Sequence, residues 1–355
     1  MVTVLNRRRQ RRRESQIKAL LIGFATVFLG IVVIVWLYFF NVISTSDETT
    51  VLKSDDDIKV TVLTAFSENH LLESSLMVRS LMKSGYTGHV AMYLMHTRQE
   101  QPMTKEYDDI QTQFQQMKEV HQSPFTFSVH HWSETMDYSD YCFKPKIISH
   151  YLSTPEGQTV DVLMWADAST RYHEGNPYLW AKKMVADGVD YVGRVGTKLG
   201  MGENTHEKTW AYLHFDKQDF KSEFELVATH FLVNFKSGTI NNERTSGRRG
   251  TIWTDVMEPW IDCGSDSHCR ECMAPPGALK DLSKEQLRQI QGPPSDKYIC
   301  HRQDQSVMGI LVYDYIRRQR GRVEFCKEEE FYICRSPYMT VTKEMIPDSV
   351  LSESK

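Results

Sequence analysis

The polar residues best suited to chemistry stand directly after two short segments rich in apolar and β-branched side chains. They are Thr64 and Asn69 after Ile58–Ala65, and Asp167, Ser169 and Arg171 after Val160–Trp165. In an open α/β sheet, ligands bind just beyond the carboxyl ends of the strands. An acid there suits a ribose hydroxyl or a metal-bound phosphate, and an arginine suits phosphate oxygens. Position alone equally allows Asp167 as an N-cap or turn residue, with Arg171 as its surface partner.

Hydrophobic periodicity predicts the elements that position these residues. Expected strands cover 58–65, 89–95, 125–129, 160–165 and 189–195, and expected helices cover 68–83, 104–120, 143–152 and 176–186. Strands that alternate with helices form crossover units, so the expected fold is α/β, with a mostly parallel sheet flanked by helices. The second half is less regular. There, 224–235 is a strand candidate, a helix begins near Asp304, and the Cys/Pro/Gly-rich stretch 262–277 is expected to form loops.

A long apolar segment near the N-terminus predicts a membrane anchor. Residues 19–43 carry no charged side chain and are long enough to cross the roughly 30 Å core of a lipid bilayer. Seven Arg and Lys residues within 1–18 precede this segment and acidic residues follow it, which predicts a cytosolic N-terminus. The alternative is a cleaved signal peptide. A signal peptide would have a shorter apolar region, followed by a cleavage site of small residues, and the sequence has no such cleavage site.

Five parts are expected along the chain. They are a basic cytoplasmic tail (1–18), a transmembrane helix (19–43), a polar stem (44–57), a lumenal α/β domain (58–335) and a C-terminal tail (336–355). The whole chain has a formal net charge of −4 although the first part is strongly basic, so the remainder is acidic. An acidic globular domain argues against a nucleic-acid partner.

All seven cysteines follow the apolar segment, which agrees with a lumenal domain. In an oxidising compartment we expect them to form disulfides, with one cysteine left over. The alternative is a zinc site that combines Cys269 and Cys272, spaced Cys-x-x-Cys, with Cys263 and Cys300. The expected compartment favours disulfides.

Four stretches carry a resemblance to known proteins through their order and spacing. They are FKPKIISHYL (143–152), DVLMWADASTRY (161–172), MEPWIDCGSDSHCRECMAPPGA (257–278) and CHRQDQSVMGIL (300–311). Over roughly Val60 to Ile316, the chain resembles a little-characterised group of type II membrane proteins of animals that are similar to glycosyltransferases of the GT-A fold. This resemblance implies a mixed, mostly parallel sheet flanked by helices. The resemblance implies a Golgi membrane enzyme that moves a sugar from a nucleoside diphosphate sugar to a glycan or glycoprotein acceptor.

The resemblance also implies roles for individual residues. Asp167 matches the first acid of an Asp-x-Asp motif, which contacts the donor ribose and often a divalent cation, Mn²⁺ or Mg²⁺. Ser169 stands where the second acid is expected, and a hydroxyl is a poor ligand for a hard dication. Three alternatives follow. His301 or Asp304 completes the metal site, or a nearby cationic side chain neutralises the donor diphosphate, or the protein has lost its activity.

The nearby cations are Lys144 and Arg171. Lys144 lies in a Phe-Lys-Pro sequence that opens a helix, which makes it a candidate phosphate contact or an ordinary surface lysine. Asp304, in an Asp-Gln element, is the candidate catalytic acid or base on the acceptor side, and its alternative role is to cap the following helix. The expected donor-binding residues are thus Thr64, Asn69, Lys144, Asp167, Ser169 and Arg171, and the expected metal ligands are Asp167 and His301.

Weaker candidates and rival functions remain open at this point. Glu225 and His230 lie on a candidate strand, and His230 is more typical of a packed histidine than of a catalyst. Residues 198–212 form either a mobile lid or an ordinary loop. The first rival function is a catalytically inactive lumenal protein that binds sugars or a partner. An anchored hydrolase is the second, although neither Gly-x-Ser-x-Gly nor His-Glu-x-x-His occurs in the sequence.

Overall fold

A computed structural model describes ten stretches of the chain. They are residues 58–67, 70–95, 104–121, 124–132, 141–173, 175–236, 250–273, 303–330, 333–336 and 339–343. All belong to one structural unit, Asp57–Lys355. The expected basic tail, transmembrane helix and stem lie outside the described residues. Within these ten stretches, no helix combines the length and apolar character that a membrane span requires.

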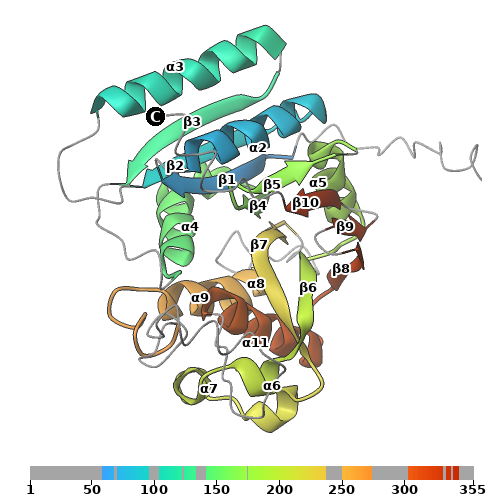
Figure 1. The fold of residues 1–355 in the computed structure, drawn as a ribbon. Coiled ribbons are helices and arrows are strands. Elements are labelled where there is room, and N and C mark those ends of the chain that lie inside the picture. Colours follow the sequence, from blue (N-terminus) through green and yellow to red (C-terminus); the bar gives the residue numbers. More distant parts are fainter. Residues whose placement is uncertain are drawn as a thin grey trace, which may run out of the picture. The chain divides into compact units, whose positions relative to one another are not determined.

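The described strands form one sheet in the order β3-β2-β1-β4-β7-β6-β8-β9-β10-β5 (Figure 1). Their bounds are β1 Val60–Ser67, β2 His89–Met95, β3 Thr126–Trp132, β4 Val162–Ala166, β5 Thr170–Tyr172, β6 Tyr191–Gly200, β7 Phe224–Asn234, β8 Val323–Glu330, β9 Ile333–Ser336 and β10 Met339–Lys343. Strands β3, β2, β1 and β4 pair in parallel, as do β6 and β8. Strand β7 runs antiparallel between β4 and β6, and the short strands β9, β10 and β5 extend the sheet in antiparallel fashion.

Helices cover both faces of the sheet. These helices include α2 Leu71–Lys83, α3 Thr104–His121, α4 Phe143–Ser153, α5 Pro177–Ala186, α9 Glu258–Cys263 and α11 Gln303–Arg317. Apolar side chains of α2, α3 and α5 pack in one core layer, and those of α4, α9 and α11 pack in the other. Figure 1 shows α2 and α3 on one side of the sheet and α4, α9 and α11 on the other. Every residue of β1 is buried because helices lie over both of its faces.

The α/β class and the mostly parallel arrangement from β3 to β8 are confirmed. Strand β2 has the expected bounds, and the other expected elements of the first half differ by a few residues at their ends. Strand β7 is antiparallel and lies between β4 and β6, which makes the sheet mixed, as the GT-A-like fold implied. The second half departs from expectation at its end. Strand β10 lies within the expected C-terminal tail, 336–355, and pairs with β5, so the sheet continues past residue 335.

The segment 198–212, expected to be a lid or a loop, consists largely of regular structure. It contains the end of β6, helix α6 Met201–Asn204 and most of helix α7 Glu207–Leu213. Met201 and Trp210 are buried, and Trp210 packs against Phe220 with ring centroids 5.2 Å apart. These buried side chains anchor the segment to the core beside α11, so the loop interpretation is wrong for most of its length.

Two disulfides join the described cysteines near α4 and α9. Cys142 pairs with Cys269, and Cys263 pairs with Cys272. Cys326 on β8 is also disulfide-bonded. Because Cys263, Cys269 and Cys272 are all oxidised, the alternative zinc site that combined them with Cys300 is wrong. The disulfide expectation is confirmed for the described pairs.

The two disulfides close loops of very different length, which predicts unequal contributions to stability. Cys142 and Cys269 are 127 residues apart in sequence, whereas Cys263 and Cys272 are 9 apart. Chain entropy predicts a loss of about 5 kcal/mol for the double substitution C142S/C269S and about 3 kcal/mol for C263S/C272S. Urea unfolding of both variants measures the difference. Equal losses, or a larger loss for the short loop, would contradict this account.

Candidate functional site

A buried lysine lies at the centre of the candidate site. The Nζ atom of Lys144 is 3.2 Å from Oδ1 of Asp167, 3.0 Å from Oδ2 of Asp304 and 3.1 Å from the carbonyl oxygen of Ala228. Its side chain is only 3% exposed. An ammonium has three N–H donors, and here oxygens of three separate groups surround it. The structure thus brings together Lys144, Asp167 and Asp304, which we call the Lys–Asp–Asp cluster.

Lys144 is held in place at the start of α4. Cys142, immediately before this helix, is joined by its disulfide to Cys269. Pro145 packs against the backbone of Gly264 so closely that any Cβ atom at residue 264 would collide with the proline ring. The Phe-Lys-Pro sequence therefore fixes the first turn of α4 against the end of α9. The surface interpretation of Lys144 is wrong.

Asp167 leaves the carboxyl end of β4. Its backbone N–H donates to the carbonyl oxygen of Thr229 on β7, and its own carbonyl accepts from the N–H of Thr170. The indole N–H of Trp165 donates to Oδ1 of Asp167 over 2.8 Å. The Asp167 side chain is 25% exposed, which makes it the accessible member of the cluster.

Asp304 is the second residue of α11 and is almost fully buried. The indole N–H of Trp260 on α9 donates to its backbone carbonyl over 3.2 Å. Burial raises the pKa of the Asp304 carboxyl, and the nearby Lys144 opposes this effect. Because the side chain is only 2% exposed, it contacts Lys144 rather than open solvent.

The cluster keeps its lysine charged. Burial lowers the pKa of the Lys144 ammonium, but attraction to the Asp167 and Asp304 carboxylates more than compensates, so its pKa is raised above the usual value. One lysine thus faces two acidic side chains, of which Asp167 carries the accessible oxygen.

The residues around Asp167 fit a divalent cation poorly. The space between its carboxylate and that of Asp304 is filled by Lys144, and Ser169 contributes no second acid. Across the described stretches, no three His, Cys, Asp or Glu side chains gather in a way that could hold a metal ion. His301, one of the expected ligands, lies outside those stretches.

The other expected donor-binding residues are placed as follows. Arg171 is buried, and its Nη1 donates to the carbonyl oxygens of Ala168 and Thr170, so it is not a surface partner of Asp167. Ser169 is nearly buried in the turn between β4 and β5. Thr64 is buried on β1, and its Oγ1 has no hydrogen-bond partner among the described residues. Asn69 lies outside the described residues.

The two weaker candidates from β7 are both buried. His230 is 5% exposed, and its Nε2 is 3.2 Å from the hydroxyl of Tyr172. Burial lowers the pKa of His230 to about 3, so the ring is neutral at physiological pH. Glu225 accepts a hydrogen bond from Ser306 on α11. His230 is therefore placed as a packed histidine, as its position on an apolar strand suggested.

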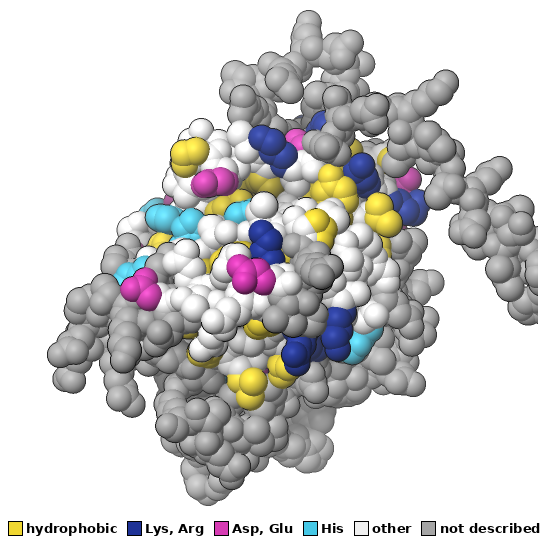
Figure 2. Space-filling model, turned by 90° about the horizontal axis from the view of Figure 1, so that it is seen from above, with side chains coloured by type: hydrophobic (Ala, Val, Ile, Leu, Met, Phe, Trp, Pro, Cys, Tyr) yellow, Lys and Arg dark blue, Asp and Glu magenta, His cyan; other side chains and the backbone are white. Residues whose placement is uncertain are grey.

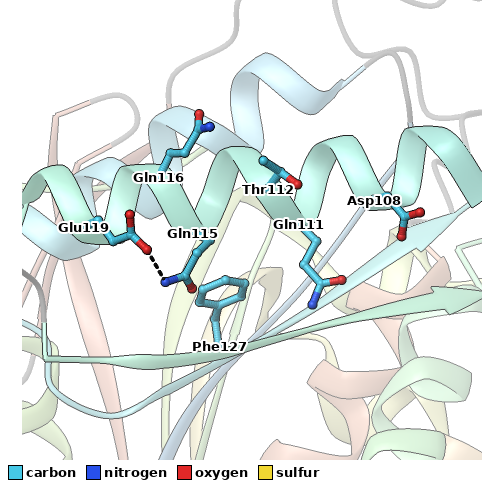
Figure 3. A pocket seen from close by; sticks show the side chains of 7 residues that line it. All are labelled: Asp108, Gln111, Thr112, Gln115, Gln116, Glu119 and Phe127. Atoms are coloured by element: carbon cyan, nitrogen blue, oxygen red, sulfur yellow. Dashed lines mark hydrogen bonds between the residues drawn. The ribbon is translucent and has the colours of Figure 1, made fainter.

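Two hollows in the described part lie away from the cluster. One, of about 460 Å³, is lined by polar side chains of α3 and by Phe127 of β3 (Figure 3), and Gln115 in its wall donates to Glu119. The other, of about 530 Å³, lies near the amino ends of β1 and β2 and includes Lys59 and His89. Neither contains Lys144, Asp167 or Asp304. The chemistry of the cluster, rather than hollow size, marks the candidate site.

On the face seen from above in Figure 2, the described side chains form no continuous basic stripe. On this face, the described Lys and Arg side chains are interrupted by acidic and hydrophobic ones (Figure 2). This agrees with the acidic balance of the chain beyond its basic tail.

Comparisons with known proteins give little guidance. No protein-family model matches the chain, and no curated protein matches it. Among solved structures, the chain is similar to the apo form of the WbbM bifunctional glycosyltransferase, at 12% identity and a TM-score of 0.37. The match covers 77% of this chain and 40% of that protein, so this chain spans about two-fifths of its length.

Sequence reasoning missed three groups that shape the cluster, namely Trp165, Trp260 and the carbonyl of Ala228. The contact of Trp165 could have been predicted from the sequence. Trp165 and Asp167 are two residues apart at a strand end, a spacing that places side chains on the same face. The contacts of Trp260 and Ala228 depend on how α9 and β7 fold against the sheet, which no local pattern reveals.

Removing Asp304 should destabilise the protein more than removing Asp167. Asp304→Ala leaves a buried ammonium with one carboxylate fewer, at an expected cost of about 3 to 5 kcal/mol. Asp167→Ala should cost less because that side chain is a quarter exposed. A suitable control is Asp266→Ala. It removes the 81% exposed partner of Lys146, which lies on α4 like Lys144, and it should cost under about 1 kcal/mol. Denaturant unfolding gives the ranking, and an Asp304 cost as small as that of Asp266 would refute it.

Burial of His230 should make the fold sensitive to acid. In the unfolded chain, His230 has a pKa of about 6.5 and becomes protonated as the pH falls. In the folded protein, its ring stays neutral down to about pH 3. Stability should therefore fall as the pH drops from about 6.5 toward 3. Between pH 7 and 4.5 this single group contributes roughly 2 to 3 kcal/mol of that loss. The variant His230→Asn should show a flatter profile in unfolding experiments over this range, and parallel profiles would exclude His230 as the source.

Proposed function

We propose that this chain is a glycosyltransferase that moves a sugar from a nucleoside diphosphate sugar to a glycan or glycoprotein acceptor. The observation that carries the proposal is the Lys–Asp–Asp cluster at the carboxyl end of β4. In open α/β sheets this edge is where ligands bind. Three residues far apart in sequence meet there, and the sequence resemblance singled out each of them.

The cluster suggests different roles for its two acids. Asp167 has an accessible carboxylate that can accept hydrogen bonds from ribose or sugar hydroxyls. Asp304 is buried against Lys144, so we assign it to holding the lysine and, through it, the orientation of Asp167. This replaces the role of catalytic acid or base expected for Asp304. In the transfer itself, the bond between the anomeric carbon and the diphosphate oxygen breaks and its electron pair leaves with the nucleoside diphosphate. The acceptor oxygen forms the new bond to the anomeric carbon, and the proton of that hydroxyl passes to the released diphosphate.

The described disulfides support the proposed compartment. Structural disulfides form in the secretory pathway and are rare in the cytosol. Together with the predicted anchor at 19–43, they support a type II protein of the Golgi membrane whose α/β domain lies in the lumen. The anchor itself lies outside the described residues.

A catalytically inactive protein on the same scaffold is the second candidate. Two observations favour it: Ser169 replaces an expected acid, and the cluster is acidic on balance where a diphosphate would need positive charge. Such a protein would bind a sugar or a partner at the same edge of the sheet. Donor binding alone would not separate the two candidates, whereas turnover would.

The full-length chain in detergent tests the proposal through ligand-induced stabilisation. A nucleoside diphosphate or its sugar should raise the melting temperature by several degrees when present at about 100 times its Kd. Asp167→Asn should abolish this shift and lower the baseline melting temperature less than Asp304→Asn does. Asp266→Asn is the matched control and should retain the shift. If UDP, GDP and CDP and their common sugars, with or without Mn²⁺, leave the melting temperature unchanged, the proposal fails.

A further inference from the structure

We propose that the donor site works without a divalent cation, because the ammonium of Lys144 occupies the position between Asp167 and Asp304 that a metal would take. This inference rests on the proposed function and concerns the same site. Glycosyltransferases that use an Asp-x-Asp motif place a dication against its carboxylates, and the residues of this chain do not fit that arrangement.

The distances within the cluster suit an ammonium rather than a metal. Nζ of Lys144 lies 3.0 to 3.2 Å from its nearest oxygens on Asp304, Ala228 and Asp167. Hydrogen bonds from an ammonium have such lengths, whereas Mg²⁺ requires oxygens at about 2.0 to 2.1 Å. The oxygens would have to move inward by about 1 Å each to bind Mg²⁺.

The lysine cannot easily move aside to admit an ion. Its Nζ lies 5.9 Å from the centre of the Trp165 ring, and its side chain is almost fully buried. The backbone of α4 at this point is tied down by the Cys142–Cys269 disulfide and by the contact of Pro145 with Gly264. Displacing the ammonium would also strip the buried Asp304 of its counter-charge, which is costly.

The acids themselves are fixed by further contacts. Oδ1 of Asp167 accepts from the indole of Trp165, and the backbone carbonyl of Asp304 accepts from the indole of Trp260. The first contact holds the carboxylate of Asp167, and the second holds the backbone of Asp304, whose carboxylate contacts the ammonium. With serine at residue 169, no second acid of the motif stands ready to complete a metal site.

The geometry also predicts what happens when the lysine is removed. In Lys144→Ala, two carboxylates and one carbonyl oxygen would face the vacated space. Oxygen ligands of this kind are the ones that hard dications prefer. The variant should therefore acquire a cation site that the natural protein lacks.

The test measures the melting temperature of the full-length protein in detergent, once with EDTA and once with about 1 mM MnCl₂. This Mn²⁺ concentration is high enough to fill a weak cation site. The natural protein should show a Mn²⁺-dependent shift of under about 1 °C, and Lys144→Ala should gain about 3 °C or more. Lys146→Ala is the matched control, because Lys146 lies on α4 like Lys144 but pairs with Asp266. Its melting temperature should not respond to Mn²⁺. Lys144→Ala/Asp304→Asn should lose the gained shift.

Each outcome bears on the inference directly. A Mn²⁺-dependent shift in the natural protein that Asp167→Asn removes would overturn it, and this arm requires no lysine variant to fold. If Lys144→Ala is unstable, Lys144→Met keeps the apolar stem against Trp165 and takes its place. Failure of a folded lysine variant to respond to Mn²⁺ would also count against the inference. Binding of a nucleoside diphosphate is measured separately: equal affinity in EDTA and Mn²⁺ supports the inference, binding only with Mn²⁺ refutes it, and no binding in either refutes the proposed function alone.

Discussion

The structure around the candidate site depends on one buried charge, the ammonium of Lys144. Moving a charge from water into a protein core costs several kcal/mol unless partners compensate. Here the compensation comes from Asp167 just after β4, from Asp304 on α11 and from the carbonyl of Ala228 on β7. Each of these elements must therefore approach the start of α4 closely. One side chain thus ties the neighbouring α4 and β4 to β7 and α11, which lie much later in the sequence.

The surrounding contacts serve this constraint. Two tryptophans, Trp165 and Trp260, donate to the two aspartates at their side-chain and backbone oxygens, respectively. The disulfides connect the segment that contains α9 to the start of α4 and to itself. Because the side chains of Lys144 and Asp304 are almost fully buried, water has little access to the cluster except at Asp167. The single accessible carboxylate is a consequence of how the other charges are buried.

The sequence predicted the first half of the fold well because its signals are local. Strand β2 is a run of apolar and β-branched residues between polar segments, and α4 begins at the expected Phe143. It predicted that Lys144, Asp167 and Asp304 matter, but not that Lys144 is buried between the other two. That burial depends on the antiparallel insertion of β7 beside β4, which brings the carbonyl of Ala228 to the site. Register between distant strands leaves no periodic signal in a single sequence.

The charge of the cluster sets the central question for its chemistry. An Asp-x-Asp site with a dication is neutral in sum, whereas two aspartates with one ammonium retain a negative charge. Such a site attracts hydroxyl groups better than phosphates, because the accessible oxygen belongs to Asp167 and the positive charge lies behind it. Recognition of a ribose or sugar by its hydroxyls is therefore the chemistry that this edge of the sheet can supply by itself. Stabilisation of a departing diphosphate requires additional positive charge at the same edge.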